Sequence, residues 1–171
     1  GFGASGRNGG WCSAMFPTSA AALARRHGQG AARDMRAAMR ATVEEVGEVT
    51  AAEGIDCGYV RGGTVVVARS RPQLDRLRAE AVDGARWGDH AEVLDAGDAR
   101  ERLDARDVVG GLWTPDCARI QPARLVRGLA EAVERRGGRV AERSRVTEIG
   151  PGGVRVAVAA DDPGPGGDGA P

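Results

Sequence analysis

The residues with the clearest chemical potential stand at the start of the chain, where five of the first ten positions are glycine. Ser5, Arg7 and Asn8 lie between these glycines. Glycine carries no Cβ and adopts positive φ freely, so successive backbone N–H groups can converge on an anion. An arginine in the same loop adds a planar fork of donors suited to phosphate oxygens. The pattern predicts a phosphate-binding loop, although composition alone also fits a flexible terminus.

Residues 1–6 match the dinucleotide-binding pattern G-x-G-x-x-G. In that fingerprint a β-strand precedes the glycines, a helix opens after them, and an acidic residue follows about 20 positions later. Here the next strand candidate begins near Ile55, and the residues between have a helical pattern. The literal match is therefore weak. An NAD-binding Rossmann protein is kept only as an alternative, which the sequence upstream of Gly1 would decide.

The longer string GASGRNGG, residues 3–10, resembles the second cofactor loop of the D-amino-acid-oxidase-like family of FAD-dependent oxidoreductases. That family includes glycine and sarcosine oxidases and γ-glutamylputrescine oxidase. A second string, ARIQPARLVRGL at residues 118–129, is similar to the segment where such chains return from the substrate domain to the FAD domain. Residues 137–149 then resemble the strands that follow. The resemblance covers most of residues 1–150 and implies FAD as the cofactor.

The resemblance also implies which residues contact the cofactor. Ser5 would donate to phosphate, Arg7 would neutralise charge near the diphosphate or flavin, and Asn8 would bond ribityl or ring oxygens. The last two loop glycines would permit close approach of the backbone, and the backbone of a strand valine would meet the adenine edge. The complete implied set is Ser5, Gly6, Arg7, Asn8, Gly9, Gly10 and Val146.

The same resemblance implies a discontinuous domain organisation. Residues 1–26 and 119–160 would belong to a partial, Rossmann-like FAD-binding domain, and residues 27–118 would form the first part of an inserted substrate domain. Residues 161–171 contain only Asp, Pro, Gly and Ala, and this composition predicts a disordered tail. The first strand of the FAD domain and its ribose-binding acid are expected before Gly1. We therefore expect an interior fragment that is inactive in isolation.

Hydrophobic periodicity predicts a mixture of helices and strands, an α/β or mixed α+β fold. Residues 55–60 and 64–68 are expected to pair as a hairpin across Gly62 and Gly63. The expected helices cover residues 20–26, 29–53, about 72–83, 98–103 and 122–136. The remaining expected strands cover residues 91–94, 108–113, 139–141, 145–149 and 154–159.

Composition excludes several classes of function. Twenty-four basic and 24 acidic residues give a net charge of zero, so no global field recruits nucleic acid or an anionic membrane. Lysine is absent, which excludes a Walker lysine or a Schiff-base lysine in this chain. Val, Leu, Ile and Phe together make up less than one-fifth of the residues, a marginal core that suits part of a larger protein. No apolar run approaches the roughly 20 residues of a membrane span.

The remaining reactive side chains do not form a recognisable site. The two histidines, His27 and His90, lack a carboxylate at any ligand spacing, so no metal is expected. Three cysteines without a C-x-x-C pair indicate reduced thiols and a cytoplasmic setting. No catalytic acid or base is assigned. The leading hypothesis is oxidation of a small amine or amino acid by hydride transfer to FAD; the alternative is a non-catalytic fragment or interaction module.

Overall fold

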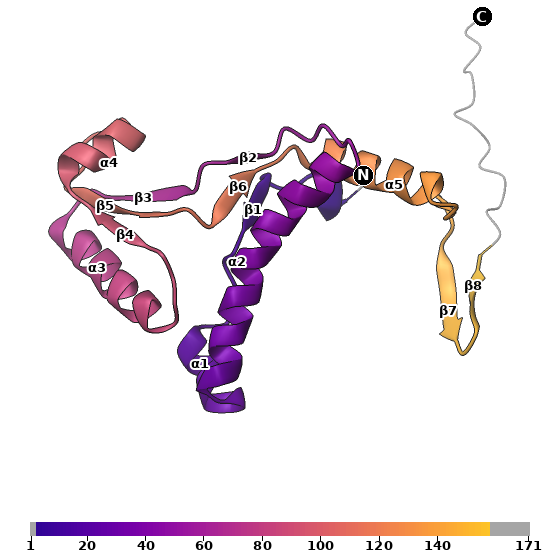
Figure 1. The fold of residues 1–171 in the computed structure, drawn as a ribbon, viewed down its shortest axis with the longest axis horizontal. Coiled ribbons are helices and arrows are strands. Elements are labelled where there is room, and N and C mark those ends of the chain that lie inside the picture. Colours follow the sequence, from indigo (N-terminus) through magenta and orange to yellow (C-terminus); the bar gives the residue numbers. More distant parts are fainter. Residues whose placement is uncertain (1–2, 158–171) are drawn as a thin grey trace, which may run out of the picture. The chain divides into compact units, whose positions relative to one another are not determined.

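The computed structural model describes residues 3–157. The chain divides into two compact units, Gly1–Leu129 and Ala130–Pro171, which are described separately. The elements in order are β1 (Trp11–Ser13), α1 (Ala20–His27), α2 (Gln29–Ala52), β2 (Val60–Arg61), β3 (Thr64–Ala68), α3 (Arg71–Arg86), β4 (Glu92–Leu94), α4 (Ala96–Arg102), β5 (Gly110–Thr114), β6 (Cys117–Arg119), α5 (Pro122–Arg135), β7 (Val146–Gly150) and β8 (Gly153–Val156) (Figure 1). This mixture of helices and antiparallel sheets confirms the predicted mixed fold class.

Two three-stranded antiparallel sheets organise the first unit. Sheet A has the order β1-β6-β2 and sheet B the order β3-β5-β4. The predicted hairpin between β2 and β3 is wrong, because β2 pairs with β6 and β3 pairs with β5. The chain changes sheets at Gly63, which has a φ of 77°. Its backbone N–H donates to the carbonyl of Cys117, with an N–O distance of 2.9 Å. The facing strand changes sheets at Pro115, which has no N–H to donate to a ladder.

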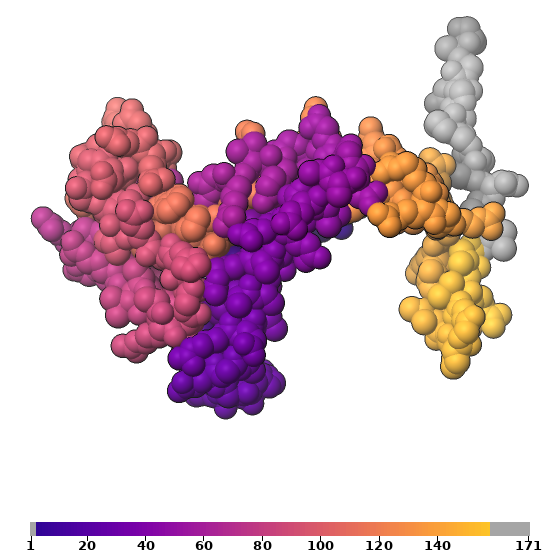
Figure 2. Space-filling model, viewed as in Figure 1, coloured from indigo at the N-terminus to yellow at the C-terminus, as the bar shows by residue number. Residues whose placement is uncertain are grey.

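Sheet B is covered on both faces by helices. Successive residues of a strand point to opposite faces, and two adjacent glycines in β5 show which helix lies on each. A Cβ on Gly110 would meet Leu74 of α3, whereas a Cβ on Gly111 would lie 3.4 Å from Ala99 of α4. The buried core of this module is formed by Leu94, Ala99 and Val108, with Val65, Val67, Ala105 and Trp113 packed against them. Figure 2 shows the β5–β6 segment as a band of orange atoms between the pink residues of α3 and α4 and the violet residues of α2.

Helix α2 packs against one face of sheet A. Ser19 caps the preceding α1, accepting a hydrogen bond from the N–H of Ala22 at 3.2 Å. Within α2, Gly47 leaves room for the ring of Tyr59, whose hydroxyl donates to the carbonyl of Val43 at 2.8 Å. The predicted long helix is therefore confirmed, and Gly47 near its C-terminal end makes room for Tyr59, the residue directly before β2.

Helix α5 begins at Pro122, as predicted, and Gln121 accepts a hydrogen bond from the N–H of Arg124 at 2.9 Å. In the second unit the helix ends before Gly137, which has a φ of 83°. The strand predicted at residues 139–141 is wrong, since no strand is formed there. Strands β7 and β8 form a two-stranded antiparallel ribbon whose described residues are all exposed. The predicted tail at residues 161–171 lies outside the described residues.

Candidate functional site

The glycine-rich loop is held in shape by Asn8. Residues Ala4–Gly6 form one turn of 3-10 helix, and the Asn8 amide nitrogen donates to the carbonyls of Ala4 and Ser5 at 3.1 and 3.3 Å. The Asn8 amide oxygen accepts from the backbone N–H of Gly10 at 2.9 Å. Asparagine side chains commonly stabilise turns by such local bonds. The sequence assigned Asn8 to the cofactor, whereas this geometry directs its amide group into the loop itself.

Gly10 anchors the loop to sheet A. It is buried with a φ of 74°, and a Cβ at this position would lie 2.4 Å from the carbonyl oxygen of Ile120. The Gly10 carbonyl accepts from the N–H of Ile120 at 2.8 Å. Strand β1 then pairs with β6 in antiparallel register, Trp11 opposite Arg119. The two strings that carried the family resemblance, more than 100 positions apart in sequence, are thus neighbours in the fold.

The outer side of the loop presents polar groups to solvent. Ser5, Arg7, Asn8 and Gly9 are exposed, and Gly6 is half-buried. Within residues 3–157 the backbone N–H groups of Asn8 and Gly9 donate to no protein acceptor. A Cβ on Gly9 would meet no atom within 4 Å, so the surface beside it is open. An ordered loop with exposed N–H donors and a neighbouring guanidinium fits an anionic, phosphate-bearing group.

The loop leads into a strand, not into an α-helix. The dinucleotide fingerprint requires a helix whose N-terminus faces the phosphates. Here the residues after Gly10 form β1, and the first α-helix begins at Ala20. This geometry argues against the literal G-x-G-x-x-G interpretation of residues 1–6.

A hollow of about 360 Å³ lies beside the loop, lined in part by Gly9, Trp11, Thr64 and Arg119. The Trp11 side chain is 72% exposed, and cross-strand pairing places it on the same face of sheet A as Arg119. An exposed indole next to a cation suits a planar, partly anionic ligand. Sequence reasoning missed Trp11, since it lies in a short apolar run whose pattern does not distinguish an exposed position from a buried one.

The three cysteines are all free thiols, and the register of β1 with β6 places Cys12 opposite Ala118 and Cys117 opposite Ser13, so these two lie on opposite faces of sheet A. Burial raises the pKa of the Cys12 thiol above its ordinary value of 9.0, and the neighbouring Cys117 and Cys57 raise it further. A raised pKa keeps the thiol protonated and unreactive at neutral pH. Cys12 and Cys117 are far apart in sequence, and the pairing of β1 with β6 brings them close together.

Val146, the predicted adenine contact, lies in the second unit. It opens β7, pairs with Val156, and is 47% exposed. Within residues 3–157, no group of three or more His, Cys, Asp or Glu side chains is arranged to hold a metal ion. In the same described part of the chain, no helix combines the length and apolar character that crossing a bilayer requires.

Comparison with known proteins agrees with the resemblance seen in the sequence. The family model DAO, FAD dependent oxidoreductase, matches residues 1–167. Gamma-glutamylputrescine oxidoreductase of Escherichia coli (strain K12) is 34% identical over 150 residues, covering 87% of this chain and 35% of that protein. The chain therefore spans about a third of the length of this curated relative.

Solved structures share the fold. Glycine oxidase from Geobacillus kaustophilus superposes with a TM-score of 0.63 at 28% identity, covering 86% of this chain and 39% of that one. L-amino acid deaminase from Proteus vulgaris gives a TM-score of 0.62 at 17% identity, covering 88% of this chain and 34% of that one. The second likeness shows a common fold alone.

Proposed function

Since the chain belongs to the DAO family of FAD-dependent oxidoreductases, we propose that it is part of an enzyme that oxidises an amine or an amino acid. The observation that carries the proposal is the ordered loop at residues 3–10. The Asn8 side chain hydrogen-bonds within the loop, and the backbone of Ile120 holds Gly10. The N–H donors of the exposed residues Asn8 and Gly9 have no acceptor within residues 3–157. When bound, FAD accepts a hydride from the carbon that bears the amine.

The loop residues would hold the diphosphate. Within residues 3–157 the N–H groups of Asn8 and Gly9 donate to no protein acceptor, and both residues are exposed on an ordered backbone, so they would lose little entropy on binding an anion. Arg7 would balance part of its charge, and Ser5 adds a hydroxyl donor. Gly6 and Gly10 would contribute through the loop backbone, since glycine has no side chain. At Gly10 a side chain would have no space against Ile120.

The hollow beside Gly9 offers the planar part of the cofactor an aromatic face from Trp11 and a positive charge from Arg119. Val146 remains our proposal for the adenine contact, because β7 belongs to a two-stranded ribbon with one unpaired edge on each strand. The assignment of residues 1–26 and 119–160 to an FAD domain and of 27–118 to a substrate domain is likewise proposed.

The isolated 171-residue chain is expected to bind FAD poorly and to be inactive, because it spans only 35% of its relative from Escherichia coli. In isolation it would then behave as the non-catalytic alternative predicts. We also propose a cytoplasmic setting, since all three cysteines are free thiols.

The test is to purify the full-length polypeptide that contains residues 1–171 and to record its visible absorbance. We expect a stoichiometric flavin spectrum that bleaches when an amine or amino acid is added without oxygen. A folded, colourless protein whose unfolding temperature does not change with added FAD would refute the proposal.

A further inference from the structure

The first unit contains two groups of elements that pack separately. Helices α3 and α4 pack on the strands of sheet B, and we call these elements, residues 64–114, the sheet B module. Helix α2 packs on β1 of sheet A. Within residues 3–157, no helix or strand of the module packs extensively against α1, α2 or a strand of sheet A. The module is therefore joined to the rest of the unit by its chain connections and by a few side chains.

Two chain segments connect the module to sheet A. One lies between β2 and β3 and the other between β5 and β6, and we call them the neck: residues 62–63 and 115–116 (Figure 1). Neither ladder of paired strands continues through the neck. Gly63 has a φ of 77°, and Pro115 has no N–H to donate to a ladder. Hinges commonly consist of a few residues at the ends of elements, so the neck is the place where the chain can bend.

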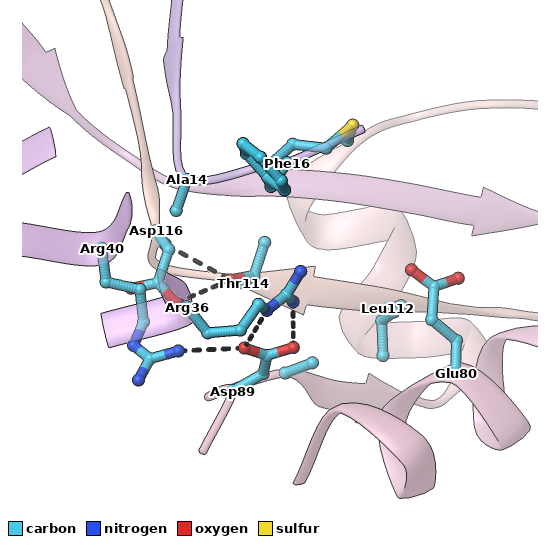
Figure 3. Close-up of a pocket in the computed structure, with 11 residues that line it drawn as sticks. Ala14, Phe16, Arg36, Arg40, Glu80, Asp89, Leu112, Thr114 and Asp116 are labelled. Carbon is cyan, nitrogen blue, oxygen red and sulfur yellow. Dashed lines mark hydrogen bonds and ion pairs between the residues drawn. The ribbon is translucent and has the colours of Figure 1, made fainter. Parts of the chain in front are cut away.

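One turn of the module reaches α2. The guanidinium group of Arg36 donates to both carboxylate oxygens of Asp89, and Arg40 donates to one of them at 3.0 Å (Figure 3). The Asp89 side chain is only 16% exposed. The guanidinium carbon of Arg33 lies 5.9 Å from the centre of the Trp87 ring. The three arginines share one face of α2 because they are three and four positions apart. We call these contacts of the α3–β4 turn the latch.

A cavity of about 300 Å³ lies beside the latch, between the module and the rest of the unit. Ala14 and Phe16 line it from the sheet A side, and Glu80 and Leu112 line it from the module (Figure 3). Asp116 of the neck also forms part of its wall. Because the walls belong to two separately packed groups, a movement of the module would change the volume of the cavity and its access to solvent.

The latch consists of ion pairs and one contact between a cation and an aromatic ring. Parts of a chain move relative to one another unless the interface between them is large and apolar. When one partner of a buried ion pair is removed, the remaining charge stays in a site that water hardly reaches, which destabilises the closed arrangement. Asp89 is the partner that Arg36 and Arg40 share, so its loss would release both arginines at once.

We propose that the sheet B module pivots on the neck as one body, and that the latch holds it in the position where it forms a wall of the cavity. The module keeps its internal packing during this movement, because Leu94, Ala99 and Val108 form a buried core within it. Separation of Asp89 from the arginines opens the cavity, and their contact closes it. This movement is a property of the first unit and does not rest on the proposed function.

The test is double electron–electron resonance, which measures the distance between two spin labels, on the full-length polypeptide that contains residues 1–171. The labels are attached to genetically encoded residues, so the native thiols stay unmodified. One label replaces Ala38 on α2 and the other replaces Ala79 on α3, both of which are exposed. We expect one narrow distance distribution in the otherwise unaltered protein. Asp89→Asn should add a second population and raise the ratio of open to closed molecules by about tenfold or more.

The matched control is Asp75→Asn, because this carboxylate of α3 pairs with Arg78 of the same helix at 3.4 Å. It should leave the distribution unchanged, and an equal opening in this variant would contradict the latch. A second pair of labels, at Ala79 and at Glu101 of α4, lies within the module and should stay narrow in Asp89→Asn. Broadening of this second pair would show local unfolding instead of a pivot and would overturn the proposal.

An unchanged distance distribution between α2 and α3 in Asp89→Asn also overturns the proposal. If that variant fails to fold, Arg36→Gln provides the second test, since it leaves Arg40 in contact with Asp89. It should produce a smaller open population than the loss of both contacts, and a distribution identical to that of the unaltered protein contradicts the latch. The measurement requires no turnover of substrate, so its outcome is independent of the flavin test above.

Discussion

Replacing Gly10 with alanine tests whether the glycine-rich loop is a fixed part of the fold. The new Cβ would lie 2.4 Å from the carbonyl oxygen of Ile120, a backbone atom that cannot move without disturbing β6. A non-glycine residue in the left-handed region costs about 1–2 kcal/mol. Relief of the overlap costs about 1–3 kcal/mol more, as for other over-packed sites. We expect Gly10→Ala to lower the free energy of unfolding by about 2–5 kcal/mol, a large part of a typical total.

The assay is urea unfolding followed by far-UV circular dichroism, with Gly9→Ala as the matched control. Gly9 is the neighbouring glycine, and a Cβ there meets nothing within 4 Å. Its substitution should change stability by less than about 0.5 kcal/mol. With a urea m-value of about 2 kcal/mol per M, the Gly10→Ala midpoint should fall by roughly 1–2.5 M relative to this control. Coincident midpoints would refute the claim that the loop is anchored on Ile120.

Three further predictions concern the loop, the charged cluster and the buried thiol. Asn8→Ala removes the bonds that close the loop, so it should cost about 1 kcal/mol and speed hydrogen exchange of the Gly10 amide; unchanged exchange would contradict this. Asp89→Asn removes the shared partner of two arginines and should cost about 1–3 kcal/mol in urea unfolding; a neutral effect would show the ion pairs to be incidental. The folded-state pKa of Cys12 is raised, so its stabilising contribution is complete below the unfolded value of 9.0 and is lost as the pH rises through the folded value. Cys12→Ala should therefore show a shallower alkaline loss of stability, and an unaltered slope would count against burial of this thiol.

The parts of the fold that follow from local signals were predictable from the sequence. Ser19 caps α1 and Pro122 opens α5, because side-chain capping and the fixed φ of proline act within a single turn. The glycine-rich loop and the family were predictable for a related reason: both depend on short strings of residues whose types are restrictive. The family identified from residues 3–10 and 118–129 is confirmed by the match over residues 1–167.

The parts that depend on distant partners were not predictable. Arg61-Gly62-Gly63 has the composition of a hairpin turn, yet the pairing is decided by strands some 50 positions later, where Pro115 interrupts the ladder. The cavity around Asp116 joins residues from both ends of the first unit, and no spacing in the sequence indicates it. The exposure of Trp11 likewise depends on which face of sheet A is covered by α2.

The central claim is that the loop at residues 3–10 contacts the diphosphate of FAD, and its most direct test is the FAD affinity of the full-length polypeptide carrying Gly9→Val. Because a Cβ at Gly9 meets no protein atom within 4 Å, the substitution should leave the unfolding midpoint unchanged. Its branched side chain would stand on the surface proposed to contact the cofactor. Isothermal titration calorimetry should show binding weakened by about tenfold or more. An unchanged affinity would contradict the account.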